Sequence, residues 1–196
     1  MIPEFFHYND FFIDEKVQFI KLENEYKVFN NEGVQIGFIG QKMSAGQKIL
    51  KLLINASLLP FHMRIMDMNN NVLVNIKRRF SFWMPKIEIL DSNEQLLGYI
   101  KQKFKFLKPE FRLMDASEQE IGKISGDWRA WNFSITNASG EEVGTISKKW
   151  AGLAKEIFTT ADKYWVNIHP DYSENTHKIV LLSAAITIDM VLKEQK

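Results

Sequence analysis

The stretch KIVLLSAAITIDMVLKE, residues 178–194, decides the fold. Its apolar run, residues 179–192, is 14 residues long, and only Ser183, Thr187 and Asp189 interrupt it. A helix of this composition has no polar face to offer water, so protein or lipid must enclose it. At about 1.5 Å per residue it is roughly 21 Å long, against about 30 Å of bilayer hydrocarbon. We interpret it as a buried core helix that the rest of the chain surrounds; a membrane anchor is the alternative.

The composition is that of one globular domain covering residues 1–196, with 45% hydrophobic and 25% charged residues. Lys and Arg number 25 and Asp and Glu 24, so a formal charge of +1 gives no overall attraction to nucleic acid. The chain has no cysteine, which excludes disulfides, thiolate metal sites and cysteine nucleophiles. The start, MIPEFFHYNDFFIDEK, lacks the features of an export signal. A cytoplasmic protein is expected.

Five segments repeat one pattern when they are aligned on a polar residue: Asn30, Asp67, Asp91, Asp115 and Asn137. Each has apolar residues four and two positions before this residue, an apolar residue six positions after it and an isoleucine nine positions after it. Alternation with period two followed by turn-forming residues predicts a β-hairpin in each segment.

A glycine stands seven positions after the aligned residue in four of the five segments: Gly37, Gly98, Gly122 and Gly144. It lies where the apolar positions change from even to odd, which indicates a β-bulge. The alternative is that the missing side chain leaves room for the central helix.

The hairpins supply ten strands, and residues 16–22 and 164–168 add two more. A helical insert is expected at about 44–59, between the first two hairpins. Twelve antiparallel strands and one apolar helix predict a closed, mainly β barrel around the helix at 178–194, because closure removes sheet edges and surrounds the helix with apolar side chains.

The C-terminal sequence GTISKKWAGLAKEIFTTADKYWVNIHPDYSENTHKIVLLSAAITIDMVLKE, with LLGYIKQKFKFLKPEFRLMD and IGKIS upstream, resembles the phospholipid scramblase family. The similarity covers roughly residues 17–194. This family belongs with the LURP-one-related proteins and the C-terminal domain of Tubby proteins. The resemblance therefore implies a twelve-stranded barrel around a hydrophobic C-terminal helix.

The resemblance also implies a calcium-binding segment with acidic residues at three places, where this chain has Thr160, Asp162 and Asp171. The threonine departs from the family pattern, and residues 164–168 supply few side-chain oxygens for an ion that takes six to eight. No calcium or other cofactor is expected. The family's palmitoylated cysteine cluster is replaced by RRFSFWMP at 78–85, so peripheral rather than spanning contact with membranes is expected.

Motifs of catalysis are missing from the sequence: HExxH, GxSxG and GxGxxG do not occur, and the four histidines are scattered singly. A non-enzymatic protein is expected.

Two basic clusters carry the functional interpretation. Alternate lysines fall on one face of a predicted strand, and a second cluster ends the preceding hairpin beside a tryptophan. The residues are Lys101, Lys103 and Lys105, and then Lys77, Arg78 and Arg79 with Trp83. Such clusters could hold anionic phospholipid head groups. The alternative is a solvated barrel exterior, and interleaved phenylalanines give nucleic acid only weak support.

Two functions of different classes follow. One is a monomeric, lipid-associated barrel that docks on anionic membrane, with phospholipid scrambling as a narrower version. The other is a soluble barrel that binds a ligand or a protein partner and has no membrane role.

Overall fold

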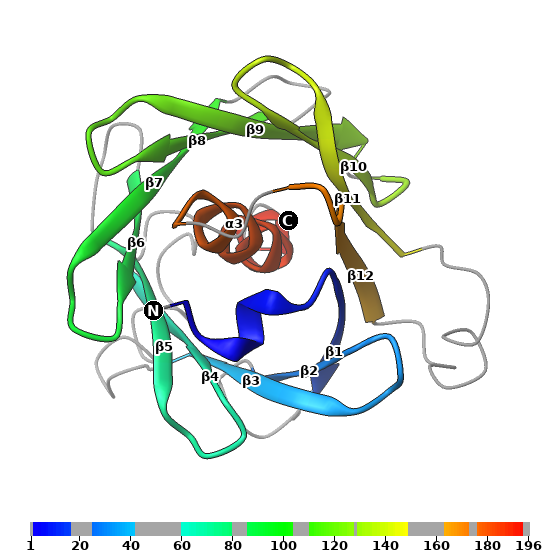
Figure 1. Ribbon diagram of the computed structural model, residues 1–196. Helices are drawn as coiled ribbons and strands as arrows, with labels where there is room; N and C mark the ends of the chain where they lie inside the picture. The colour runs from blue at the N-terminus through cyan, green and yellow to red at the C-terminus, as the bar shows by residue number, and fades with distance from the viewer. Residues whose placement is uncertain are drawn as a thin grey trace.

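A computed structural model shows a closed barrel of twelve antiparallel strands with a helix inside it (Figure 1). The structure describes residues 2–16, 25–41, 60–79, 86–103, 110–127, 129–148, 163–172 and 176–193. Each strand pairs with its neighbours in sequence, and β1 also pairs with β12, which closes the wall. The strands are β1 Asp10–Lys16, β2 Glu25–Phe29, β3 Gln35–Gln41, β4 Phe61–Met66, β5 Val72–Arg78, β6 Lys86–Asp91, β7 Leu96–Lys103, β8 Glu110–Asp115, β9 Glu120–Asp127, β10 Asn132–Asn137, β11 Glu142–Ser147 and β12 Lys163–Ile168. The predicted fold is confirmed.

The first strand lies earlier than predicted, at Asp10–Lys16 rather than at residues 16–22. Phe11 and Ile13 face the core, whereas Phe12 belongs to a separate cluster outside it. Three apolar residues in a row hide the alternation that would mark this strand. Residues 17–24 and the insert predicted at 44–59 lie outside the described residues.

The helix α3, Thr176–Lys193, runs inside the barrel (Figure 1). Residues 180–188 are all at most 1% exposed, so this part of the helix is buried on every side. The hydroxyl of Tyr164, on β12, donates a hydrogen bond of 3.0 Å to the carbonyl of Ile186, and Thr187 donates one to the carbonyl of Ser183. In the described chain, no helix is both long and apolar enough to cross a bilayer. The interpretation as a core helix is confirmed.

The N-terminal segment also fills the barrel, at the end where α3 begins (Figure 1). Its 3₁₀ helix η1, Glu4–His7, buries Phe5 and Phe6 in the core, and the Phe5 ring lies 5.6 Å from that of Phe11. The buried Lys178 of α3 donates a hydrogen bond of 3.1 Å to Asn9 Oδ1. The segment is therefore fixed to both the wall and the helix.

The five predicted turns share one geometry. In each, the aligned residue donates its N–H to the carbonyl four positions on, and its side-chain oxygen accepts from backbone N–H groups of the turn. In the turn after β6, Asp91 Oδ1 accepts from the N–H groups of Asn93 and Gln95 at 2.8 Å each. The fourth residue of each turn has a φ between 62° and 85°: Gly33, Asn70, Glu94, Glu118 and Gly140. These bonds explain why Asn or Asp stands at the aligned position.

The predicted bulges are confirmed, because the pairing register shifts within each of the five hairpins. A Cβ at Gly98 would lie 2.3 Å from the carbonyl oxygen of Met114 on the next strand and 3.0 Å from Val180 Cγ2 on α3. The same approach to a neighbouring carbonyl occurs at Gly37, Gly122 and Gly144. Close contact between strands is the shared reason for glycine, and room for the helix adds to it at Gly98.

We expect Gly98→Ala to destabilise the barrel by about 1–3 kcal/mol, as overpacking does, because its Cβ would meet backbone that cannot move aside. Gly40→Ala is the control, since its Cβ would meet only the end of the flexible Met66 side chain, at 3.3 Å. Thermal unfolding followed by circular dichroism compares the two. Equal melting temperatures would contradict the packing argument.

Leu182→Ala should lower the free energy of unfolding by about 2–5 kcal/mol, because Leu182 is fully buried inside the barrel. Val34→Ala, at a side chain that is 54% exposed, should change it by no more than about 0.5 kcal/mol. Urea titration of both variants measures the difference. A helix that served only as an anchor would leave both proteins equally stable.

Candidate functional site

Three lysines lie on the outer face of β5–β7: the predicted site residues Lys77 and Lys101, and their neighbour Lys86. Lys77 and Lys101 each follow a buried isoleucine, so the alternation of the strand turns them outward. Lys86 pairs with Lys101 across β6 and β7. All three ammonium groups are ion-paired: Lys77 with Glu94, and Lys86 and Lys101 with the two carboxylate oxygens of Glu118.

These ion pairs repeat with the hairpins. Lys77 and Lys101 each stand ten residues after the aligned aspartate of their own hairpin. Their partners Glu94 and Glu118 each stand three residues after the aligned aspartate of the following hairpin. Both glutamates have φ 64°, which turns them back over the preceding hairpin's lysine. Sequence reasoning missed this pairing, although the repeat alignment contains the signal.

Glu118 is held in its charged form. Hydrogen bonds from Lys101 and Lys86 lower the pKa of its carboxyl to about 2, and the bond to Glu118 raises the pKa of Lys86. The fixed carboxylate of Glu118 therefore neutralises part of the positive charge of the two lysines beside it. Among the described residues, the surface predicted to be basic consists of lysine–glutamate ion pairs.

The two arginines of the second cluster lie on opposite sides of the wall. Arg78 is 5% exposed, has the inward parity of β5, and places its guanidinium 4.6 Å from the ring centre of Phe61. The side chain of Arg79 is 82% exposed, and its Nε lies 3.3 Å from Glu88 Oε1. Arg78 is therefore not on one surface with Lys77 and Arg79.

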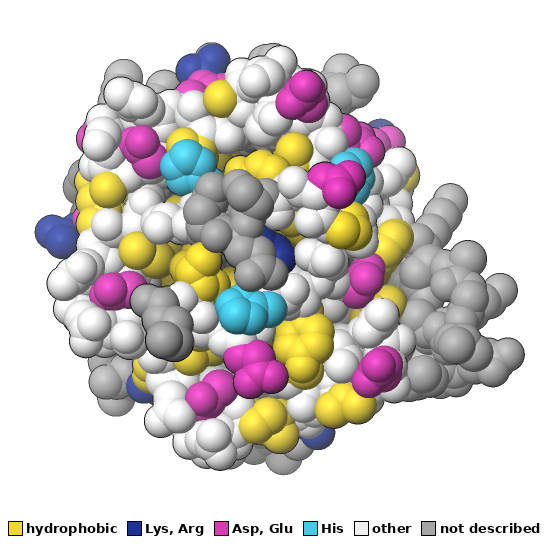
Figure 2. Space-filling view, in the orientation of Figure 1, with side chains coloured by type: hydrophobic (Ala, Val, Ile, Leu, Met, Phe, Trp, Pro, Cys, Tyr) yellow, Lys and Arg dark blue, Asp and Glu magenta, His cyan; other side chains and the backbone are white. Residues whose placement is uncertain are grey.

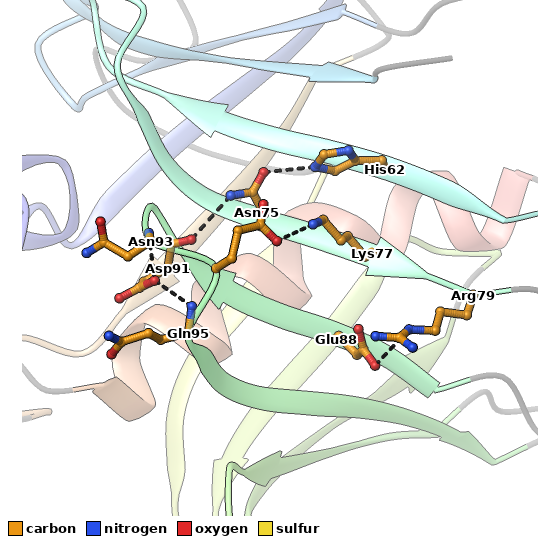
Figure 3. A network of polar contacts seen from close by, with 9 residues as sticks. His62, Asn75, Lys77, Arg79, Glu88, Asp91, Asn93 and Gln95 are labelled. Atoms are coloured by element: carbon orange, nitrogen blue, oxygen red, sulfur yellow. Dashed lines mark hydrogen bonds and ion pairs between the residues drawn. The ribbon is translucent and has the colours of Figure 1, made fainter. Parts of the chain in front are cut away.

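Next to the ion pair of Lys77, a polar network joins β4, β5 and β6 (Figure 3). His62 Nε2 lies 2.8 Å from Asn75 Oδ1, and Asn75 Nδ2 donates to the carbonyl of Asp91 at 3.2 Å. Burial lowers the pKa of His62, and the nearby Lys77 and Arg64 lower it further, so the imidazole is neutral at pH 7. The network ties three strands together, which is a structural role.

The remaining predicted site residues are described only in part. Asp171 is exposed in the turn after β12, whereas Asp162 and Thr160 lie outside the described residues. So do Lys105, Trp83 and the side chain of Lys103. Within the ranges that the structure covers, no three His, Cys, Asp or Glu side chains gather as a metal ion requires.

The connections that leave the two ends of the barrel differ in their content of charged residues. The five hairpin turns and the connection from β12 to α3 meet at one end, which we call the hairpin end. Their residues, 30–34, 67–71, 92–95, 116–119, 138–141 and 169–175, include seven Asp and Glu and no Lys or Arg. Figure 2 looks onto this end, where acidic side chains are spread widely.

The other six connections leave from the opposite end, which we call the connection end. They carry eleven Lys and Arg against three Asp and Glu, and four of the five tryptophans of the chain. They are residues 17–24, 42–60, 79–85, 104–109, 128–131 and 148–162. Where the structure describes them, Arg129 is exposed and Lys148 Nζ lies 4.5 Å from the ring centre of Trp131.

The comparisons with known proteins agree with this architecture. The X-ray structure of a protein from Arabidopsis thaliana aligns with a TM-score of 0.54 over 97% of this chain and 98% of that one, at 8% sequence identity, and so supports the fold alone. No curated protein matches the chain. The profile of the Scramblase family matches residues 15–195, nearly the whole sequence. The chain belongs to the Scramblase family.

Proposed function

We propose that this barrel is a non-enzymatic, peripheral membrane protein that docks on anionic phospholipid through its connection end. The observation that carries the proposal is the unequal composition of the two sets of connections: the sequences that leave the connection end contain eleven Lys and Arg and four tryptophans, and those at the hairpin end contain seven Asp and Glu. Membership of the Scramblase family supports a lipid as the partner.

The physical argument is one of orientation. Each Lys or Arg near an anionic leaflet contributes about 1 kcal/mol, and tryptophan favours the interface between head groups and acyl chains. An acidic hairpin end is repelled by the same surface. A chain of net charge +1 can therefore bind an anionic membrane when its connection end faces the membrane and its hairpin end points away.

The lateral lysines contribute less to this docking than the connection end does. Lys77, Lys86 and Lys101 are ion-paired to glutamates, so an approach by the side of the barrel would bring acidic groups to the membrane as well. Exchange of lipid between leaflets is not part of the proposal, because α3 and the inward side chains occupy the described interior.

The direct test is sedimentation with vesicles of phosphatidylcholine, with and without phosphatidylserine, at low and high salt. Wild-type protein should bind only the anionic vesicles, and less at high salt, because exposed charges are screened over about 8–10 Å. The variant Lys105→Gln/Lys108→Gln/Arg129→Gln should bind roughly a hundredfold more weakly at low salt.

The control variant Lys27→Gln/Lys77→Gln/Lys123→Gln loses the same charge from the side of the barrel and should bind nearly as wild type. Equal loss in both variants would mean that net charge alone drives binding. Wild-type protein that ignores anionic vesicles at low salt would overturn the proposal and favour the soluble ligand- or partner-binding barrel.

Glu118→Gln separates end docking from side docking. It releases Lys86 and Lys101 on the side of the barrel, so side docking would be strengthened well beyond the effect of the added net charge. Glu32→Gln, in the first hairpin turn, adds the same net charge elsewhere. End docking predicts equal affinities for the two variants on anionic vesicles, and a clear advantage of Glu118→Gln would assign the contact to β6 and β7.

A further inference from the structure

The hairpin end carries a groove of about 300 Å³ between the N-terminal segment and the turns of the first two hairpins. The segment forms one wall through Glu4 and Tyr8, and the opposite wall comes from residues 34–36 and 67–69. Phe5 and Phe6 anchor the segment in the core, and the carbonyl of Asn9 accepts a hydrogen bond of 2.8 Å from Ile168. The groove is thus built from fixed elements and is already formed in the free protein.

The exposed large apolar side chains of the described residues gather at this groove. Of the large hydrophobic side chains in the described chain, two are exposed, Val34 at 54% and Met68 at 49%, and both line this groove. Ile36 and Leu73 lie half-buried beneath them. Exposed apolar side chains gathered in one concave place mark an interaction site more often than scattered ones do.

The surroundings are acidic. Glu4 and Asp67 are among the residues that line the groove, and none of the hairpin-end connections contains Lys or Arg. Asp67 is held in place by the N–H groups of Asn69 and Asn71 and by the Asn71 side chain, all at 2.8 Å. In the lower part of Figure 2, over the first two hairpins, hydrophobic and acidic side chains lie next to each other.

We propose that this groove binds a short segment of a partner protein in which an apolar side chain lies next to lysine or arginine. The apolar side chain enters between Val34 and Met68, and its basic neighbour lies against Asp67 and Glu4. The volume holds one or two side chains, at the lower limit for a small-molecule pocket, and the acidic rim disfavours an anionic membrane as occupant. The site lies at the end opposite to the proposed membrane contact and does not depend on it.

The carboxylate of Asp67 keeps its charge in mild acid. The hydrogen bond from the Asn71 side chain lowers the pKa of Asp67, and backbone N–H groups act in the same direction. Binding that depends on this carboxylate should therefore hold while pH falls from 7 toward the ordinary range of carboxyl groups and should be lost below it.

The test uses three capped pentapeptides with glycine at both ends. The first has leucine between lysine and arginine, the second has leucine between two glutamates, and the third has serine between lysine and arginine. The ¹³C-methyl signal of Met68 is followed by NMR during titration, without membranes. The first peptide should shift it to saturation, and the other two should leave it in place.

Variants then separate the two parts of the site. Asp67→Asn should weaken binding of the first peptide by up to about fivefold, the factor of an exposed ion pair. The turn should survive, since Asn30 and Asn137 form the same turn at the equivalent position. Asp115→Asn removes the same charge from a turn outside the groove and should have no effect. Val34→Ser/Met68→Ser, monitored by calorimetry, should abolish binding.

Three results would overturn the proposal. One is a Met68 signal that the first peptide does not move, or moves no further than the glutamate peptide does. Another is an equal loss of affinity in Asp67→Asn and Asp115→Asn, which would mean diffuse attraction to an acidic surface. The third is a signal that shifts with protein concentration alone, which would make a second copy of the chain the occupant. None of these outcomes bears on binding to anionic vesicles.

Discussion

The structure depends on one constraint, which is that an apolar helix without a polar face must be surrounded. Residues 180–188 have no exposed side, so the wall has to pass around α3 completely. A sheet closed on itself does this and also leaves no unpaired edge strand. The helix in turn fills a space that a twelve-stranded barrel could not fill with its own side chains. Tyr164 bonded to Ile186, and Gly98 packed against Val180, mark places where wall and helix fit each other.

The repeat that builds the wall also distributes its charge. Every hairpin uses Asp or Asn to fold its turn, and these turns gather at one end of an antiparallel barrel. The connections at that end contain seven Asp and Glu and no Lys or Arg. The other six connections, which obey no such rule, leave from strand ends on the opposite side, and their sequences contain most of the basic residues outside the strands. Glu94 and Glu118 come from the same repeat and neutralise lysines on the side. The ends are therefore the surfaces with distinct chemistry, and this follows from the order of the strands.

The sequence predicts the features that repeat, and it misses those that depend on contacts between distant segments. Turns, bulges and the core helix follow from periodicity and residue type. The position of β1 was wrong because Phe11, Phe12 and Ile13 hide their alternation. Arg78 could have been placed inward from the parity of Ile76, two residues before it. The groove was not predictable, because it joins the N-terminal segment to two turns whose relative positions only the closed barrel fixes.

The barrel allows its two ends to act independently. A strand of eight residues such as β7 is about 26 Å long at roughly 3.3 Å per residue, and a tilt of about 40° leaves roughly 20 Å along the barrel axis. That distance exceeds the Debye length of about 8 Å at physiological ionic strength, so charges at one end are screened from ligands at the other. Between them lies a closed ladder of strands around a packed helix. Occupation of one end should therefore leave affinity at the other unchanged, and a barrel held on a membrane would still present its acidic groove to a partner.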